Sequence, residues 1–313
     1  IMKNFIDKLF FELIDEFKNK SEEEIYDNIF LKYQLVPQTT KTSLEKFLKD
    51  YPYWGYLDSK NLNFEIFKKK AYVFKHNHKD FVWLYNKLKD EKSKFILFAI
   101  LNNFYNFDFS NLDKARERIY KQYFDLDLIR YCSKEVFVDV GSYYGETTLD
   151  FINTYGEDSY KSIYCYEITK NMLEYSKTYL SKFKNVHYKN FAVSNSNKSL
   201  FFDENDASSS ANHISKNGKS KVKATSLDNN IKEKITMIKM DIEGGERKAL
   251  IGAKEHIKND LPKLLISVYH NNTDLFKLPK LINKITNRYD FYLRYYGGNI
   301  YATEIVLFCI PRK

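Results

Sequence analysis

Cysteine is scarce in this chain of 313 residues, which contains only Cys132, Cys165 and Cys309. No two of the three have the spacing of metal ligands, and an odd number argues against a disulfide scaffold. We therefore expect a reducing compartment, and specifically the cytoplasm.

Long apolar runs are also missing. Residues 1–20 mix charged and apolar side chains at helical spacing. They have neither the apolar core of a signal peptide nor a run long enough to cross a bilayer. We expect no membrane span, and no internal repeat is present.

No long basic tract accompanies the formal net charge of +9, and the excess of Lys and Arg is spread along both halves of the chain. Nucleic-acid binding proteins usually concentrate this charge, so we expect no nucleic-acid partner. A substrate that carries phosphate and a plain solvated surface both fit the charge. Hydrophobic residues at 43% and charged residues at 29% indicate a globular protein.

The first 130 residues are predicted to be helical. Apolar residues recur every three or four positions near the start, namely Phe5, Ile6, Phe10, Leu13 and Phe17. Ser21 and Glu24 fit a capping box. Residues 90–107 indicate another helix, and residues 116–123 continue the pattern. We predict a helical domain at 1–130 that assists acceptor binding or self-association into a homo-oligomer.

Residues 131–313 are predicted to form a second domain in which strands and helices alternate. The five main strands are expected at 135–140, 162–167, 186–190, 235–240 and 264–269, with minor strands at 199–202 and 222–225. Two further strands, 289–296 and 303–311, form a terminal hairpin. This alternation predicts an α/β fold with helices on both faces of a mostly parallel sheet and an antiparallel strand at the end.

A glycine-containing loop, 138–147, follows the first buried strand. It lacks the lysine of a P-loop, and its spacing is G-x-x-x-G rather than G-x-G-x-x-G. Asp139 before Gly141 favours a cationic ligand and would repel a pyrophosphate. Glu167 ends the next strand, where a carboxylate can accept bonds from ribose hydroxyls.

These features predict S-adenosylmethionine as the cofactor, because its sulfonium and ammonium groups suit an acidic loop. The alternative is an ordinary strand–turn–helix joint without a ligand. The predicted cofactor-binding residues are Asp139, Gly141, Ser142, Tyr143, Gly145, Glu146, Thr147, Glu167, Ile168, Asn190, Phe191, Ala192 and Asp241.

A second acidic segment, Lys-Met-Asp-Ile-Glu-Gly-Gly-Glu at 239–246, ends the fourth strand. Carboxylates this close must be paired, hydrated, metal-bound or protonated, and Lys239 offsets part of the charge. Glu246 suits the first turn of a helix, where the dipole favours an acid. For Asp241 and Glu243 we favour a functional role.

With these motifs, the sequence resembles the FkbM family of class I methyltransferases. The matching segments are 138–147, 225–228, 239–246, 249–253, 266–270, 291–294 and 303–307, with 122–125 upstream. The sequence departs from the family pattern at Tyr144, where related loops often carry Asp, and at Ser267, where many relatives have Glu.

The resemblance implies a Rossmann-like seven-stranded sheet and methyl transfer, usually to a hydroxyl group. It favours a sugar acceptor, such as a nucleotide-linked sugar or a bacterial capsule-type glycan. The alternatives are methylation of a protein or a polyketide, and a non-catalytic interaction module with a degenerate methyltransferase fold.

Transfer to an alcohol requires a base beside the acceptor oxygen. The candidates are Asp241, Glu243 and His270. His270 follows the fifth strand, and an unperturbed imidazole is suited to base catalysis near neutral pH. The same three side chains could instead bind a divalent metal, although no spacing proves it and we predict none. For the acceptor we predict contacts with Ser209, Asn212, Tyr269 and Arg294.

Overall fold

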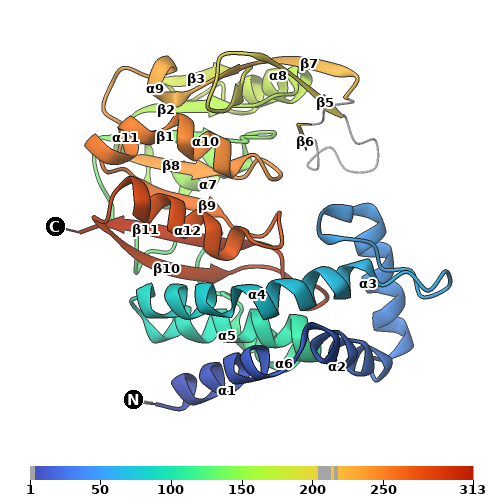
Figure 1. Cartoon of the computed structure of the whole chain (residues 1–313). Coiled ribbons are helices and arrows are strands. Elements are labelled where there is room, and N and C mark those ends of the chain that lie inside the picture. The colour runs from blue at the N-terminus through green and yellow to red at the C-terminus, as the bar shows by residue number, and fades with distance from the viewer. Residues whose placement is uncertain (1–3, 204–212, 215–217, 313) are drawn as a thin grey trace. The chain divides into compact units, whose positions relative to one another are not determined.

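The computed structural model describes residues 4–203, 213–214 and 218–312 (Figure 1). Clustering of contacts divides the chain into two compact units that do not follow sequence order. The first contains residues 1–118, 268–279 and 290–307, and the second contains 119–267, 280–289 and 308–313.

The beginning of the first unit is helical. Its elements are α1 (Phe5–Asn19), α2 (Glu22–Gln34), α3 (Gln38–Asp50), the 3-10 turn η1 (Pro52–Trp54), α4 (Glu65–Lys87), α5 (Glu91–Asn106) and α6 (Phe109–Ala115). The predicted capping box at Ser21 and Glu24 is present at the start of α2. Asp90 caps α5 by accepting a bond from the Ser93 backbone N–H.

Aromatic side chains form the core of this helical region. Phe10 stacks on Tyr85 with ring centroids 3.9 Å apart, and Phe17 stacks on Phe74 at 4.4 Å. Phe10 and Phe17 are completely buried. Phe10, Phe17, Phe74 and Tyr85 therefore belong to the core, as their helical spacing predicts, whereas Phe5 of α1 and Tyr72 of α4 are exposed.

One helical prediction is wrong. Residues 116–123 are not helical, because Arg116 and Glu117 are drawn out along a strand: Arg116 bridges Tyr295, and the Glu117 N–H donates to the Tyr295 carbonyl at 2.7 Å. Tyr123, with φ at +70°, has a left-handed conformation that no α-helix accepts.

The predicted seven-stranded sheet is confirmed, with order β10-β11-β9-β8-β1-β2-β3 and an antiparallel terminal strand. Its strands are β1 (Glu135–Val140), β2 (Tyr160–Tyr166), β3 (Val186–Lys189), β8 (Met237–Met240), β9 (Lys263–Ser267), β10 (Tyr289–Tyr295) and β11 (Ile305–Pro311). The pairs β1–β2, β1–β8, β8–β9 and β2–β3 are parallel. Every residue of β1 is buried, as expected for a central parallel strand.

Helices and a small sheet complete the described chain. The helical elements are α7 (Glu146–Tyr155), η2 (Glu157–Ser159), α8 (Lys170–Tyr179), α9 (Leu227–Asn230), α10 (Glu246–Gly252), α11 (Lys254–Asn259) and α12 (Asp274–Ile285). In Figure 1, α10 and α11 lie on one face of the sheet and α7 and α8 on the other. The second sheet, ordered β4-β7-β5-β6, joins β4 (Ala192–Val193), β7 (Ser220–Thr225), β5 (Ser199–Asp203) and β6 (His213–Ile214). The two predicted minor strands are its antiparallel pair β5–β7.

Candidate active site

The loop after β1 turns sharply over the end of β8. The N–H groups of Gly141 and Ser142 both donate to the Tyr166 carbonyl, at 2.9 and 3.0 Å. Gly141 has φ at +78°, and a Cβ added there would lie 1.9 Å from the backbone oxygen of Asp241. No residue with a side chain fits this position, so the loop can pass close to β8 only with glycine.

A buried ion pair lies beneath the loop. Lys239 Nζ lies 3.0 Å from Asp139 Oδ1 and donates to the Gly141 carbonyl at 2.6 Å. The Thr148 hydroxyl donates to the other Asp139 oxygen at 2.9 Å. Burial lowers the pKa of Lys239, but the carboxylates of Asp139, Asp241 and Glu167 outweigh it and raise the pKa above its usual value. Lys239 thus ties β8 to β1 and to the loop.

Because Asp139 pairs with Lys239, it contributes to the site through that lysine. Its side chain has no exposed surface, and both oxygens face Lys239 or Thr148. Contact between Asp139 and a cofactor therefore stays a prediction. Asp139 supports the loop after β1 through Lys239, which also donates to the Gly141 carbonyl.

Glu167 lies at the end of β2, facing the same loop. Its carboxylate accepts bonds from the backbone N–H groups of Tyr143 at 3.1 Å and Thr169 at 2.8 Å. Burial raises its pKa, although these N–H groups and Lys239 act in the opposite direction. A carboxylate held this way has lone pairs left for two further donors.

The residues after β3 complete this edge. The Asn190 side-chain amide donates to the Glu167 and Ile168 carbonyls, both at 2.9 Å. Ile168 packs against a small buried cluster that includes Ala192. The ends of β2 and β3 are thereby joined. Phe191, half-buried, lies between Asn190 and Ala192 in the chain.

Within the loop and the start of α7, the predicted residues differ in exposure. Ser142 is buried, and its hydroxyl has no hydrogen-bond partner among the described residues. Tyr143 has a strained φ of +50°. Glu146 is exposed and Thr147 half-buried. An unsatisfied buried hydroxyl beside free helix N–H groups is consistent with a ligand-binding loop.

Tyr123 connects two strand ends, and the sequence analysis did not include it among the site residues. Its hydroxyl donates to Asp241 Oδ2 at 2.6 Å and lies 3.0 Å from the Ser267 hydroxyl. Since the phenol has one proton, the Ser267 hydroxyl is then the donor of the second bond. The only signal in the sequence was the 122–125 segment of the family resemblance.

The loop after β8 is also strained. Glu243 has φ at +52° and is followed by Gly244 at +93°. Buried Glu246 accepts a bond from the Ile242 N–H at 2.9 Å, so it holds the turn before α10 as expected for a residue at a helix start. Left-handed backbone outside glycine costs energy and persists where surrounding structure enforces it.

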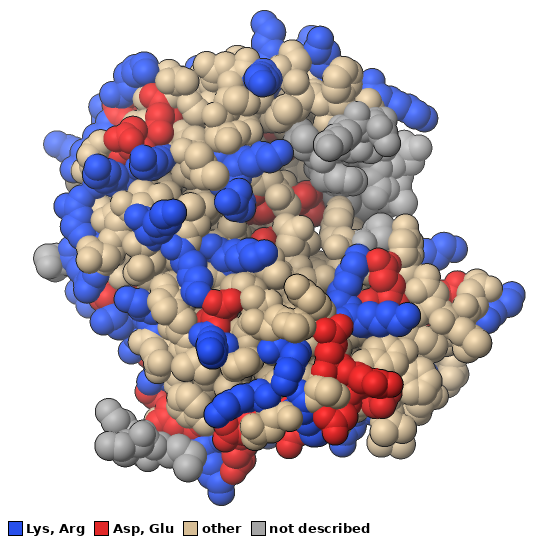
Figure 2. Space-filling view, in the orientation of Figure 1, with Lys and Arg blue, Asp and Glu red and all other residues tan. Residues whose placement is uncertain are grey.

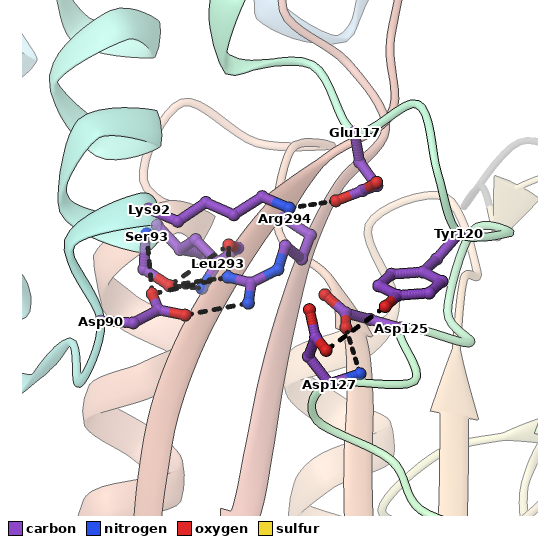
Figure 3. A network of polar contacts seen from close by, with 9 residues as sticks. All are labelled: Asp90, Lys92, Ser93, Glu117, Tyr120, Asp125, Asp127, Leu293 and Arg294. Carbon is purple, nitrogen blue, oxygen red and sulfur yellow. Dashed lines mark hydrogen bonds and ion pairs between the residues drawn. The ribbon is translucent and has the colours of Figure 1, made fainter.

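Three predicted residues belong to the first unit. His270 is buried and its ring lies 4.2 Å from that of Tyr269. The Tyr269 hydroxyl donates to Glu304 at 3.0 Å. Arg294 is buried, and its guanidinium binds Asp90 at 2.9 Å and the Ser93 hydroxyl at 3.1 Å (Figure 3).

The ion pair with Asp90 and the hydrogen bond to Ser93 allow Arg294 to be buried. Burial raises the pKa of Asp90, but Arg294 and Ser93 outweigh it and hold the pKa below its usual value. The Leu293 N–H also donates to the Ser93 hydroxyl, so the network fixes β10 against α5. Substrate binding by Tyr269 and Arg294 stays a prediction. Ser209 and Asn212, the other two predicted substrate-binding residues, lie outside the described residues.

Comparison with known families decides the class of protein. The model described as "Methyltransferase FkbM domain" matches residues 139–297, half of the chain, including the loop after β1 and the 239–246 segment. The chain belongs to the FkbM methyltransferase family. No curated protein matches the sequence.

One solved structure supports the fold. A methyltransferase FkbM from Methylobacillus flagellatus KT is similar at a TM-score of 0.65 with 24% identity, over 77% of this chain and 60% of that one. An rRNA methylase from Streptococcus thermophilus has a TM-score of 0.39 with 14% identity, over 58% and 90%. A putative methyltransferase from Streptococcus mutans, in complex with SAH, has 0.38 and 12%, over 58% and 91%. The last two are too distant to add an argument.

Two further findings concern membrane-spanning helices and surface charge. No helix within the described ranges is long and apolar enough to cross a membrane. In Figure 2, Lys and Arg side chains predominate over the upper and left part of the face in view, and Asp and Glu gather mainly in its lower part.

Proposed function

We propose that this FkbM chain binds S-adenosylmethionine and methylates a hydroxyl group of a sugar. One observation supports the cofactor most: Glu167 is buried at the end of β2, and its carboxylate faces the tight loop at Gly141. This is where α/β proteins bind the ribose of a nucleotide.

The residues present fit this cofactor. Glu167 would accept bonds from the ribose hydroxyls, and the loop backbone with the unsatisfied Ser142 hydroxyl would contact the rest of the molecule. The net charge beneath the loop also fits, because one cation, Lys239, faces Asp139, Asp241 and Glu167. When bound, S-adenosylmethionine supplies an electrophilic methyl group on a sulfonium sulfur.

Asp241 is our choice for the group that accepts the hydroxyl proton. It is half-buried at the end of β8, and the Tyr123 hydroxyl fixes one of its oxygens. The bond from Tyr123 orients the Asp241 carboxylate, whose second oxygen would accept the proton. Glu243 and His270 are the other candidates, and a metal at these residues is not part of the proposal.

The acceptor class is inferred from the family resemblance and from charge. The sequence has no long basic tract, which does not favour nucleic acid. A nucleotide-linked sugar or a capsule-type glycan suits a polar, hydroxyl-bearing acceptor. Transfer of radiolabelled methyl groups to nucleotide sugars, glycans and proteins tests this choice; labelling of protein alone would favour the alternative of protein methylation.

We also propose self-association through the N-terminal helices, where Leu31 and Leu35 are exposed by 63% and 80%.

Replacing Glu167 with Ala is expected to weaken cofactor binding by about ten-fold to a hundred-fold, because charge-assisted bonds to the ribose would be lost. Calorimetric titration with S-adenosylhomocysteine measures this. In the wild type the affinity should fall as pH falls through the raised pKa of Glu167, since the protonated carboxyl has fewer acceptor sites.

The matched control is Glu174→Ala, which removes an exposed carboxylate on α8. We expect its affinity to equal that of the wild type at every pH. Equal binding by Glu167→Ala and Glu174→Ala would show that the ribose site lies elsewhere.

A further inference from the structure

Lys70 is a buried lysine with no charged partner among the described residues. It lies on α4 in the first unit, and its residue is 5% exposed. Its Nζ lies 3.6 Å from the centroid of the Phe104 ring and 5.6 Å from that of Tyr301. No hydrogen bond or ion pair of Lys70 occurs among the described residues. Aromatic faces attract an ammonium group, but they replace only part of its lost hydration.

Two small cavities meet at this lysine. One, of about 20 Å³, is lined by Trp54, Asn272, Phe104 and Lys70 among others. The other, also of about 20 Å³, is lined by Tyr301, Phe104 and Lys70. Each has room for a group the size of a water molecule.

Polar atoms in these walls also lack partners. The Tyr301 hydroxyl and the Asn272 side-chain oxygen are buried and have no hydrogen-bond partner in the described structure. The Asn272 amide nitrogen is occupied, because it donates to the Trp54 carbonyl at 3.0 Å. The Trp54 indole N–H in turn donates to the Tyr269 carbonyl. The wall is therefore fixed, while the ammonium group and a phenol hydroxyl remain available as donors.

From this arrangement we propose that Lys70 anchors a binding site for a small carboxylate anion. An ammonium group and a phenol are donors, so they select a ligand rich in acceptors, and the single positive charge matches one negative charge. The small volume of the two cavities limits the ligand to one of few atoms. Lys70, Tyr301 and Asn272 are not among the predicted cofactor-binding, catalytic or substrate-binding residues, so the proposal adds a site to those predicted for methyl transfer.

The electrostatics give the site a dependence on pH. Burial lowers the pKa of Lys70 to about 7, so near neutral pH the amine is only partly protonated. Among the described residues that line the two cavities, Tyr269 and Tyr301 are the only other titratable groups, and burial raises the pKa of Tyr301 well above its usual range. The anion would bind the protonated amine, so affinity should fall about ten-fold per pH unit above 7.

The test is a titration with sodium formate, at constant ionic strength, followed by tryptophan fluorescence. The chain has two tryptophans, and Trp83→Phe leaves Trp54, which lines the cavity, as the only reporter. We expect saturable binding of formate that weakens from pH 6 to pH 9. In Lys70→Met, an apolar replacement of similar length, the dissociation constant should rise about ten-fold to a hundred-fold and lose its pH dependence.

Lys68→Met is the matched control, because it removes an exposed lysine from the same helix. It should bind formate like the parent. Tyr301→Phe provides a second variant should Lys70→Met fold poorly, and its affinity should fall several-fold. Absence of saturable binding, equal binding by Lys70→Met, or equally tight binding of chloride would each overturn the proposal.

Discussion

Replacing Asp241 with Asn is expected to lower kcat by about 10²–10⁴, because the amide cannot accept the proton of the acceptor hydroxyl. The affinity for S-adenosylmethionine should change far less, since a base acts mainly in the transition state. Single-turnover methyl transfer to the identified acceptor, together with calorimetry on the same preparation, separates the two effects.

His270→Ala tests the competing candidate by the same measurements. Asp158→Asn and His187→Ala, which change exposed side chains, are the matched controls and should keep the parent kcat. If His270→Ala alone lost turnover, the base would be His270 and not Asp241. If both variants methylated the acceptor at the parent rate, neither assignment would stand.

Replacing Lys239 with Met is expected to lower the free energy of unfolding by about 3–5 kcal/mol, because it leaves Asp139 as an uncompensated buried charge. Urea denaturation followed by circular dichroism measures this. Adding Asp139→Asn to Lys239→Met should recover part of the loss, since the orphaned charge is then removed. A full loss in the double variant would show that the effect comes from packing.

The Lys239–Asp139 ion pair also predicts how the stability of the protein changes with pH. The pKa of Lys239 is raised above its usual value of 10.5, so its contribution to stability is complete below pH 10.5. The contribution is lost as pH rises through the raised value. Wild-type stability should therefore fall in alkaline solution more steeply than that of Lys239→Met.

The fold could be predicted from short segments because the local pattern of apolar residues indicates each strand. A buried apolar run such as β1, followed by glycine and a helix, determines its own structure and its place in the sheet centre. The position of Glu167 beside the loop could be predicted for the same reason, since the end of the next parallel strand lies at the same edge of the sheet.

Contacts between distant segments could not be read from the sequence in this way. Tyr123 and Asp241 are 118 positions apart, and nothing in local spacing shows that a phenol reaches that carboxylate. Asp139 and Lys239 are also far apart in the sequence, so their ion pair could not be predicted from local spacing; contact of Asp139 with a ligand stays a prediction. Periodicity at 116–123 predicted a helix because it carries no information on the strand that Arg116 joins.

Calorimetric titration of the full chain with S-adenosylhomocysteine, S-adenosylmethionine and NAD tests the central claim most directly. We expect both sulfur nucleotides to bind at one site per chain, Glu167→Ala to weaken both, and NAD to give no heat of binding. Binding of NAD with no binding of either sulfur nucleotide would contradict it.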